Sequence, residues 1–162
     1  MKYIYIYTDG STINNQNKSG NRKGGVGVFF GDNDKRNISF GLKETPKQKV
    51  TNNVCELIAC IKGIEKIMSS DKVIGKQILL YTDSMYIVNT ISTWAKTWET
   101  NGWKKDSGKI QNLELIKKLY YYSINFGILI KHCNSHTDEP DDKESDEWKI
   151  WHGNSKICPV CY

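Results

Sequence analysis

Alternating isoleucine and tyrosine residues open the chain, and this pattern constrains the fold more than any other. Residues 2–11 read KYIYIYTDGS, with isoleucines on one side of the alternation and tyrosines on the other. A period of two is typical of a strand, and apolar residues on both sides predict a central strand whose two faces are covered. We expect this strand to deliver Asp9 at its end, where Gly10 and Ser11 then turn the chain.

Asp9 has two interpretations at this point. A carboxylate that closes a buried strand loses its hydration, so it needs a partner such as a cation. Alternatively, Asp9 only caps the turn through its own backbone, because Asp and Gly are common turn residues. A second apolar run also ends in Thr-Asp-Ser at residues 82–84, which favours a pair of related strand ends over a single turn.

Composition predicts one globular domain that covers residues 1–162. The chain is long enough for a real core, and its 38% hydrophobic and 11% aromatic residues argue against disorder. A net charge of +5 suits a polyanionic partner without requiring one. No apolar run reaches the length of a membrane span, and the alternating start is unlike a signal peptide. Five cysteines without a disulfide framework spacing favour a reducing, intracellular compartment.

The remaining segments predict further strands and helices around this first strand. A turn at 31–34 joins two more strands, which gives an antiparallel meander of three. Later strands alternate with helices, so we expect an α/β fold in which helices pack on a mixed sheet. The expected strands are 2–11, 24–31, 36–42, 77–82 and 126–131, and the expected helices are 51–68, 85–94 and 111–123. The polar residues 133–151 are expected to form a flexible loop.

Three acidic residues stand out by their positions. Asp9 and Asp83 each close a strand, and Glu56 lies along the edge of the helix that Thr51 caps, where we expect it to be neither exposed nor in the core. If the two strands are neighbours, the three carboxylates converge at one rim of the sheet and need protons or cations between them. Oxygen ligands without His or Cys favour Mg²⁺ or Mn²⁺. The alternative is three unrelated turn and surface acids.

These acids belong to a longer series of motifs that resembles ribonuclease H of the type 1 branch, the enzymes that cut the RNA strand of RNA–DNA hybrids. Each motif alone is weak, whereas their order and spacing together are specific. The series extends from residue 3 to about 154 and comprises TDGS at 8–11, TNNxxEL at 51–57, TDS at 82–84, Trp94, NGWK around Trp103, SHTxEP at 135–140 and GN at 153–154.

The resemblance implies a ribonuclease H-like fold with a five-stranded sheet, in which two parallel strands extend the meander. It also implies hydrolysis of hybrid RNA with two metal ions, Mg²⁺ or alternatively Mn²⁺. Asp9 is then the bridge between both metals, and Glu56 and Asp83 hold the second. His136 matches a histidine that helps product release or proton movement, although an ordinary surface-loop histidine is the alternative. The implied partner is an RNA–DNA hybrid, bound by a monomer that needs no membrane.

One group of residues matches those that line the RNA strand in this family. Gly10, Ser11, Asn52 and Asn53 occupy these positions. An amide can both donate to and accept from a 2′-hydroxyl group, which distinguishes RNA from DNA. Helix capping is an alternative role for the two asparagines.

A second group, residues 94–109, matches the basic protrusion that grips the DNA strand. Trp94 and Trp103 offer flat faces for sugars, and Lys104 and Lys105 offer charge for phosphates. The alternative is a tryptophan core with a solvated lysine face. The helix with Asn-Asn-x-x-Glu and this protrusion also argue against a related polynucleotidyl transferase such as an integrase.

Cys158 departs from the family pattern. Relatives continue Gly-Asn-x-x-Ala-Asp into a final helix, whereas this chain reads GNSKIC at 153–158, so Cys158 stands at the fourth active-site acid. A thiol is a poor Mg²⁺ ligand, and we therefore expect a weakened first metal site. Two functions stay open, a cleaving enzyme and a hybrid-binding module with impaired cleavage. Cys158 and Cys161 also form a lone CxxC, for which zinc is a weakly supported alternative.

Overall fold

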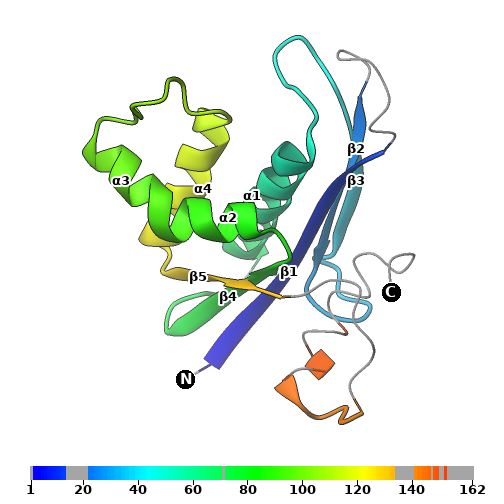
Figure 1. Ribbon diagram of the computed structural model, residues 1–162. Helices are drawn as coiled ribbons and strands as arrows, with labels where there is room; N and C mark the ends of the chain where they lie inside the picture. Colours follow the sequence, from blue (N-terminus) through cyan, green and yellow to red (C-terminus); the bar gives the residue numbers. More distant parts are fainter. Residues whose placement is uncertain are drawn as a thin grey trace.

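A five-stranded mixed sheet with β1 at its centre forms the body of the protein, in the order β3-β2-β1-β4-β5 (Figure 1). The computed structural model describes residues 2–13, 22–70, 72–133, 141–146, 148–149 and 152. The strands are β1 (Lys2–Ile13), β2 (Lys23–Phe29), β3 (Ile38–Lys43), β4 (Lys76–Thr82) and β5 (Ile128–His132). The helices are α1 (Asn52–Ser70), α2 (Met85–Asn89), the π-helical turn η1 (Thr90–Trp94), α3 (Ala95–Thr100) and α4 (Leu113–Asn125).

The strand directions confirm the predicted topology. β1, β2 and β3 form an antiparallel meander, and β4 and β5 extend it with parallel pairing. β1 loses its partner β4 after the pair Tyr7–Tyr81, but β2 continues to pair with it as far as Ile13. The predicted turn at Gly10 and Ser11 is therefore wrong, because β2 supplies these residues with strand partners. Asp9 lies inside β1, at the point where β4 ends beside it.

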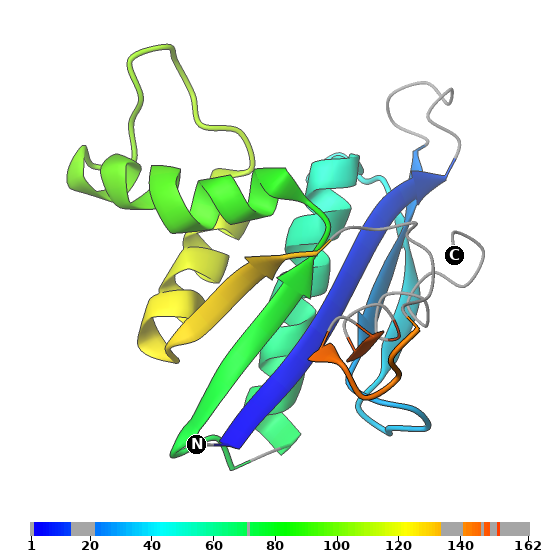
Figure 2. The ribbon, with the colours of Figure 1, turned by 60° about the horizontal axis from the view of Figure 1, so that its bottom comes forward.

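The helices pack on the isoleucine face of the sheet. Ile4 and Ile6 of β1 join one core with residues of α1, α2 and α4. Figure 2 shows α1 behind the sheet and the described residues of the segments 141–146 and 148–149, in orange, in front of it. On that front face Tyr3 and Tyr5 are 51% and 41% exposed. Tyr7 on the same face is buried, and Asp146, Trp148 and His152 line a pocket together with the three tyrosines, so the expectation of a covered second face is wrong only for the exposed start of the strand.

Helix α1 begins where the sequence predicts, because the Thr51 hydroxyl accepts a hydrogen bond from the Val54 N–H at 3.2 Å. Glu56, however, is buried, and so are Cys60 and Gly63 one and two turns later. The expected position of Glu56 between core and surface is therefore wrong. This line of residues is the side of α1 that touches the sheet.

Two other segments are more helical than predicted. The helix expected at 85–94 continues through η1 into α3 and ends at Thr100. In the expected loop 133–151, Lys149 N–H donates to the Ser145 carbonyl at 3.2 Å, and Asp146, Trp148 and Lys149 are helical. The flexible-loop prediction is wrong for these residues, and 134–140 lie outside the described part. None of the described helices is both long and apolar enough to span a membrane.

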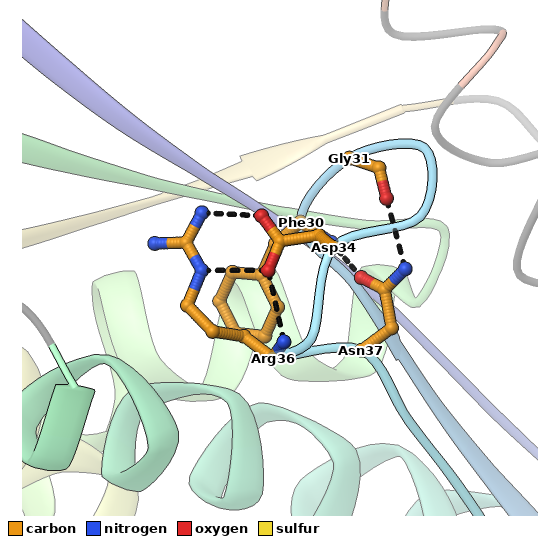
Figure 3. A network of polar contacts seen from close by, with 5 residues as sticks. All are labelled: Phe30, Gly31, Asp34, Arg36 and Asn37. Atoms are coloured by element: carbon orange, nitrogen blue, oxygen red, sulfur yellow. Dashed lines mark hydrogen bonds and ion pairs between the residues drawn. The ribbon is translucent and has the colours of Figure 1, made fainter.

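The predicted turn between β2 and β3 is confirmed by a polar network (Figure 3). Asp34 N–H donates to the Gly31 carbonyl at 3.2 Å, and the Arg36 guanidinium binds both oxygens of Asp34 at 2.7 and 2.9 Å. Asn37 accepts from Phe30 N–H and donates to the Gly31 carbonyl, each at 2.8 Å. The Arg36 guanidinium also lies 4.9 Å from the centre of the Phe30 ring. These contacts hold the turn together from both sides.

Gly10 is the position at which a side chain is least tolerable. A methyl group there lies 2.6 Å from the Glu56 backbone nitrogen, so α1 must shift. We expect Gly10→Ala to lower the free energy of unfolding by about 1–3 kcal/mol in urea denaturation. Gly25→Ala is the matched control on β2, where an added methyl group meets nothing within 4 Å. Equal stability of the two variants contradicts the close approach of α1 to β1.

Candidate active site

Three carboxylates from three separate elements meet at one end of the sheet. Asp9 of β1, Glu56 of α1 and Asp83 after β4 each offer an oxygen atom within 4.8 Å of the others. The parallel pairing brings them together, since Asp9 and Asp83 each follow the last β1–β4 pair, Tyr7–Tyr81, by two residues. The predicted convergence of these three acids is confirmed.

Glu56 reaches this cluster because α1 lies directly on β1. Gly10 has no side chain at the crossing point, and its backbone hydrogen-bonds to the Glu56 carboxylate. Thr8, on the same side of β1, donates to the Tyr81 carbonyl at 3.2 Å and lies 3.6 Å from the Cys60 sulfur. The first turns of α1 are therefore held against the part of β1 that carries Asp9, beside the end of β4.

Burial strongly perturbs the ionisation of Glu56 in this cluster. Glu56 is 7% exposed, and its Oε2 atom is buried and has no hydrogen-bond partner among the described residues. Burial, and then the charges of Asp9 and Asp83, raise the pKa of Glu56 to about 10. Without a cation, the carboxyl group of Glu56 is therefore protonated at neutral pH.

The residues fit a hard divalent cation. All three donors are carboxylate oxygens, and the described residues bring no His or Cys into this group. Mg²⁺ and Mn²⁺ prefer such oxygen ligands and keep several waters. A cation also supplies the partner that Glu56 Oε2 lacks and favours the charged form of Glu56. Asp9, Glu56 and Asp83 are the residues that could hold it.

The predicted RNA-strand residues lie around the start of α1. Asn52 Oδ1 accepts hydrogen bonds from the backbone N–H of Thr12 at 2.9 Å and from its hydroxyl at 2.8 Å. Asn52 therefore ties α1 to β1, while Thr51 caps the helix. Asn53 and Ser11 are exposed, and Gly10 is buried. Thr12 lies beyond the expected strand 2–11, although the β-branched residues Thr12 and Ile13 are a signal that the strand continues.

The two tryptophans of the predicted protrusion have different surroundings. Trp94 is 43% exposed and packs against Trp98, with ring centres 6.2 Å apart. Trp103 donates from Nε1 to the Tyr121 hydroxyl at 3.3 Å and stands edge-on to the Tyr120 ring. Trp103 thus fixes the segment between α3 and α4 against α4, whereas Trp94 offers a face to solvent.

The two lysines that follow Trp103 lie in the segment that projects between α3 and α4 (Figure 1). Lys104 is exposed and Lys105 is half-buried. His136, Cys158 and Cys161 lie outside the described residues, so the predicted roles of His136 and Cys158 and the alternative zinc site at Cys158 and Cys161 stay predictions.

Comparisons with known proteins agree on one family. The family model described as RNase H matches residues 1–149. A ribonuclease H from Syntrophus aciditrophicus (strain SB) is 34% identical over 153 residues, which are 91% of this chain and 80% of the relative. The human Ribonuclease H1 is 31% identical over 145 residues, 89% of this chain and 48% of that protein. A probable ribonuclease H of Acanthamoeba polyphaga mimivirus is 33% identical over 121 residues, 74% of this chain and 52% of that protein.

Solved structures share the fold at lower identity. A type 1 RNase H with the type 2 active-site motif superposes with a TM-score of 0.65 at 22% identity, covering 99% of this chain and 72% of that chain. The foamy viral protease-reverse transcriptase in complex with RNA/DNA hybrid gives a TM-score of 0.66 at 18% identity, covering 98% of this chain and 20% of that chain.

The raised pKa of Glu56 predicts how stability depends on pH in metal-free protein. The folded state keeps a proton that the unfolded state loses near pH 4.5, so the contribution of Glu56 is full below that pH and is lost as the pH rises towards 10. Glu56→Gln removes this titration. Because one pK unit corresponds to about 1.4 kcal/mol, we expect the variant to be more stable than wild type by at least that amount at pH 8.

Urea denaturation in EDTA between pH 5 and 9 measures this difference. Glu65→Gln is the control on the same helix. Burial by itself raises the pKa of Glu65, but the Tyr122 hydroxyl and Lys118 lower it, and the net pKa lies below its usual value. The stabilising contribution of ionised Glu65 is lost only as the pH falls. Above pH 6, the unfolding free energy of Glu65→Gln should therefore change with pH as it does in wild type. A difference between wild type and Glu56→Gln that does not grow with pH contradicts the buried, protonated Glu56.

Proposed function

This chain belongs to the ribonuclease H family, and we propose on that basis that it cleaves the RNA strand of RNA–DNA hybrids endonucleolytically, using two metal ions. The observation that carries the proposal is the convergence of Asp9, Glu56 and Asp83 within 4.8 Å at the carboxyl end of the parallel strands. A protein that only bound hybrids has no use for three converging acids, of which one is buried and finds no hydrogen-bond partner for its Oε2 atom in the described part of the chain.

Each acid has its own role in this proposal. Asp9 lies in β1, beside the end of β4 that precedes Asp83, and would be shared by the two metals, while Glu56 and Asp83 would hold the second. A pair of bound Mg²⁺ ions lowers the pKa of a water and stabilises negative charge on the leaving 3′ oxygen. Glu56 gives up its proton when it becomes a ligand, because the nearby positive charge reverses the effect of burial. His136 helps the proton or the product to leave.

The surrounding residues select the hybrid. Ser11, Asn52 and Asn53 surround the start of α1, where they contact the 2′-hydroxyl groups of the RNA strand. Gly10 lets α1 lie directly on β1 and thereby places these residues beside the RNA strand. Trp94 contacts the DNA strand with its exposed face. All of these residues come from one chain, so the proposed activity needs no second copy.

Trp103, Lys104 and Lys105 complete the DNA-strand surface. Trp103 holds the projecting segment against α4, and the two lysines attract the phosphates.

Cys158 makes the first metal site weaker than the second. Asp9 and water molecules then hold the first metal without a fourth carboxylate, because a thiol is a soft and poor ligand for Mg²⁺. The same residue favours a second candidate function, a hybrid-binding module whose cleavage is impaired. The two functions differ in whether the wild-type protein breaks the RNA strand.

Three proteins on one labelled hybrid distinguish the two functions. We expect wild type to release RNA fragments in Mg²⁺ and Asp9→Asn to lose at least about a hundredfold in rate, because the amide cannot bridge two cations. Cys158→Asp should cleave faster than wild type. Gel electrophoresis of the labelled RNA strand measures all three. Cleavage by Cys158→Asp alone establishes the binding module instead of the enzyme.

The weakened first site predicts a preference between metals. Mn²⁺ tolerates a softer and less regular ligand set than Mg²⁺. Wild type should therefore cleave several-fold faster in Mn²⁺, and Cys158→Asp should reduce this preference. Initial cleavage rates across a titration of each metal give the comparison. Equally fast cleavage by wild type in both metals is incompatible with a weakened site.

A further inference from the structure

A pocket lined by aromatic rings lies on the face of the sheet opposite the helices. It has a volume of about 480 Å³, which is in the range of sites for small ligands. The Tyr81 ring of β4 is stacked with the rings of Tyr5 and Tyr7 of β1, with centres 6.4 and 5.4 Å apart. Asp146 and Trp148, from the segment in front of the sheet, line the same pocket (Figure 2). The proposed cleavage uses none of these five residues.

The rings of this pocket suit a positively charged ligand. The face of an aromatic ring carries partial negative charge and attracts a cation that lies within about 6 Å of the ring centre. Tyr5 is 41% exposed, so the protein covers its ring only in part. Trp148 is half-buried and lines the pocket from the other side. A cation that enters the pocket therefore meets rings from both the sheet and the segment in front of it.

The charges around the pocket also favour a cation. Residues 141–149 read DDKESDEWK and thus contain five acids and two lysines, whereas the whole chain carries a net charge of +5. The Asp146 side chain is 93% exposed, and its Oδ1 atom lies 3.8 Å from Lys149 Nζ. Burial is the main cause that raises the pKa of Tyr81, but Tyr5 and Asp146 raise it further, so the charge of Asp146 acts on the rings. The same charge opposes a phosphate in this pocket.

Arg36 shows how the protein itself holds a guanidinium at the edge of this pocket (Figure 3). Its Cζ atom lies 4.9 Å from the centre of the Phe30 ring, which lines the pocket, and Asp34 binds its nitrogen atoms at 2.7 and 2.9 Å. An aromatic face and a carboxylate are therefore the two contacts that this guanidinium uses. A guanidinium is flat and weakly hydrated, and it stacks on rings more readily than an ammonium group does.

We propose that the aromatic pocket binds an arginine side chain from a basic segment of a partner protein. The rings of Tyr5 and Trp148 and the carboxylate of Asp146 supply the same kinds of contact that hold Arg36. Exposed acids continue outside the pocket at residues 141, 142 and 144, where an extended basic segment places its further positive charges. A small cation makes no use of these additional acids. The inference goes beyond the proposed cleavage and does not depend on it.

A fluorescein-labelled tetra-arginine peptide tests this site in the absence of nucleic acid. Fluorescence anisotropy measures its binding to wild type. Tyr5→Leu removes a partly exposed ring and should weaken binding about fivefold, whereas Tyr5→Phe keeps the ring and the affinity. Asp146→Asn should weaken binding and reduce its dependence on salt. Phe126→Leu is the matched control, because Phe126 is a 40% exposed ring beside α4 and outside the pocket, and it should bind as wild type does.

Tetra-lysine and spermine show whether the pocket recognises the guanidinium or only positive charge. Wild type should bind both more weakly than tetra-arginine. Equal binding of the three probes, or wild-type affinity in a folded Tyr5→Leu variant, overturns the inference. Binding that Asp9→Asn abolishes and Tyr5→Leu does not change assigns the peptide to the carboxylate cluster and overturns it too. Tyr5→Leu should cleave a hybrid at the wild-type rate, so failure of this inference leaves the proposed function intact.

Discussion

The direct contact between α1 and β1 is the constraint on which the rest of the structure depends. Gly10 and Gly63 are the points of closest approach, and a methyl group at Gly63 lies only 2.9 Å from the Ile6 Cγ2 atom. Because the helix can lie this close, Glu56 reaches the strand end that carries Asp9. The same contact buries Glu56 and thereby determines its chemistry. The packing of α1 on β1 and the burial of Glu56 therefore both depend on the absence of a side chain at Gly10 and at Gly63.

Burial beside two other acids makes the cluster unfavourable on its own. The protein tolerates it because the isoleucine face of the sheet and the apolar side of α1 form one continuous core around it. A cation changes the balance, since it gives Glu56 Oε2 a partner and reverses the repulsion between the carboxylates.

Much of this arrangement follows from local patterns in the sequence. The alternation in β1, the cap at Thr51 and the matching strand ends before Asp9 and Asp83 predict the sheet, the helix and the convergence of the acids. The extension of β1 beyond Gly10 could not be predicted in this way, because β2 supplies the pairing and local turn residues suggest the opposite. The burial of Glu56 also depends on a tertiary contact. No spacing along a helix shows how closely a neighbouring strand approaches.

The two neighbours of β1 come from very different distances along the chain. β2 follows it closely, so the meander of β1, β2 and β3 can pair early in synthesis. The parallel pair of Tyr7 in β1 with Tyr81 in β4 can form only after residue 81 has been synthesised. Asp83 joins Asp9 only after this long-range parallel pairing has formed. A nascent chain therefore has a nearly complete antiparallel half before it can hold metal at this centre. Metal binding at the carboxylates therefore requires that β1 has paired with β4.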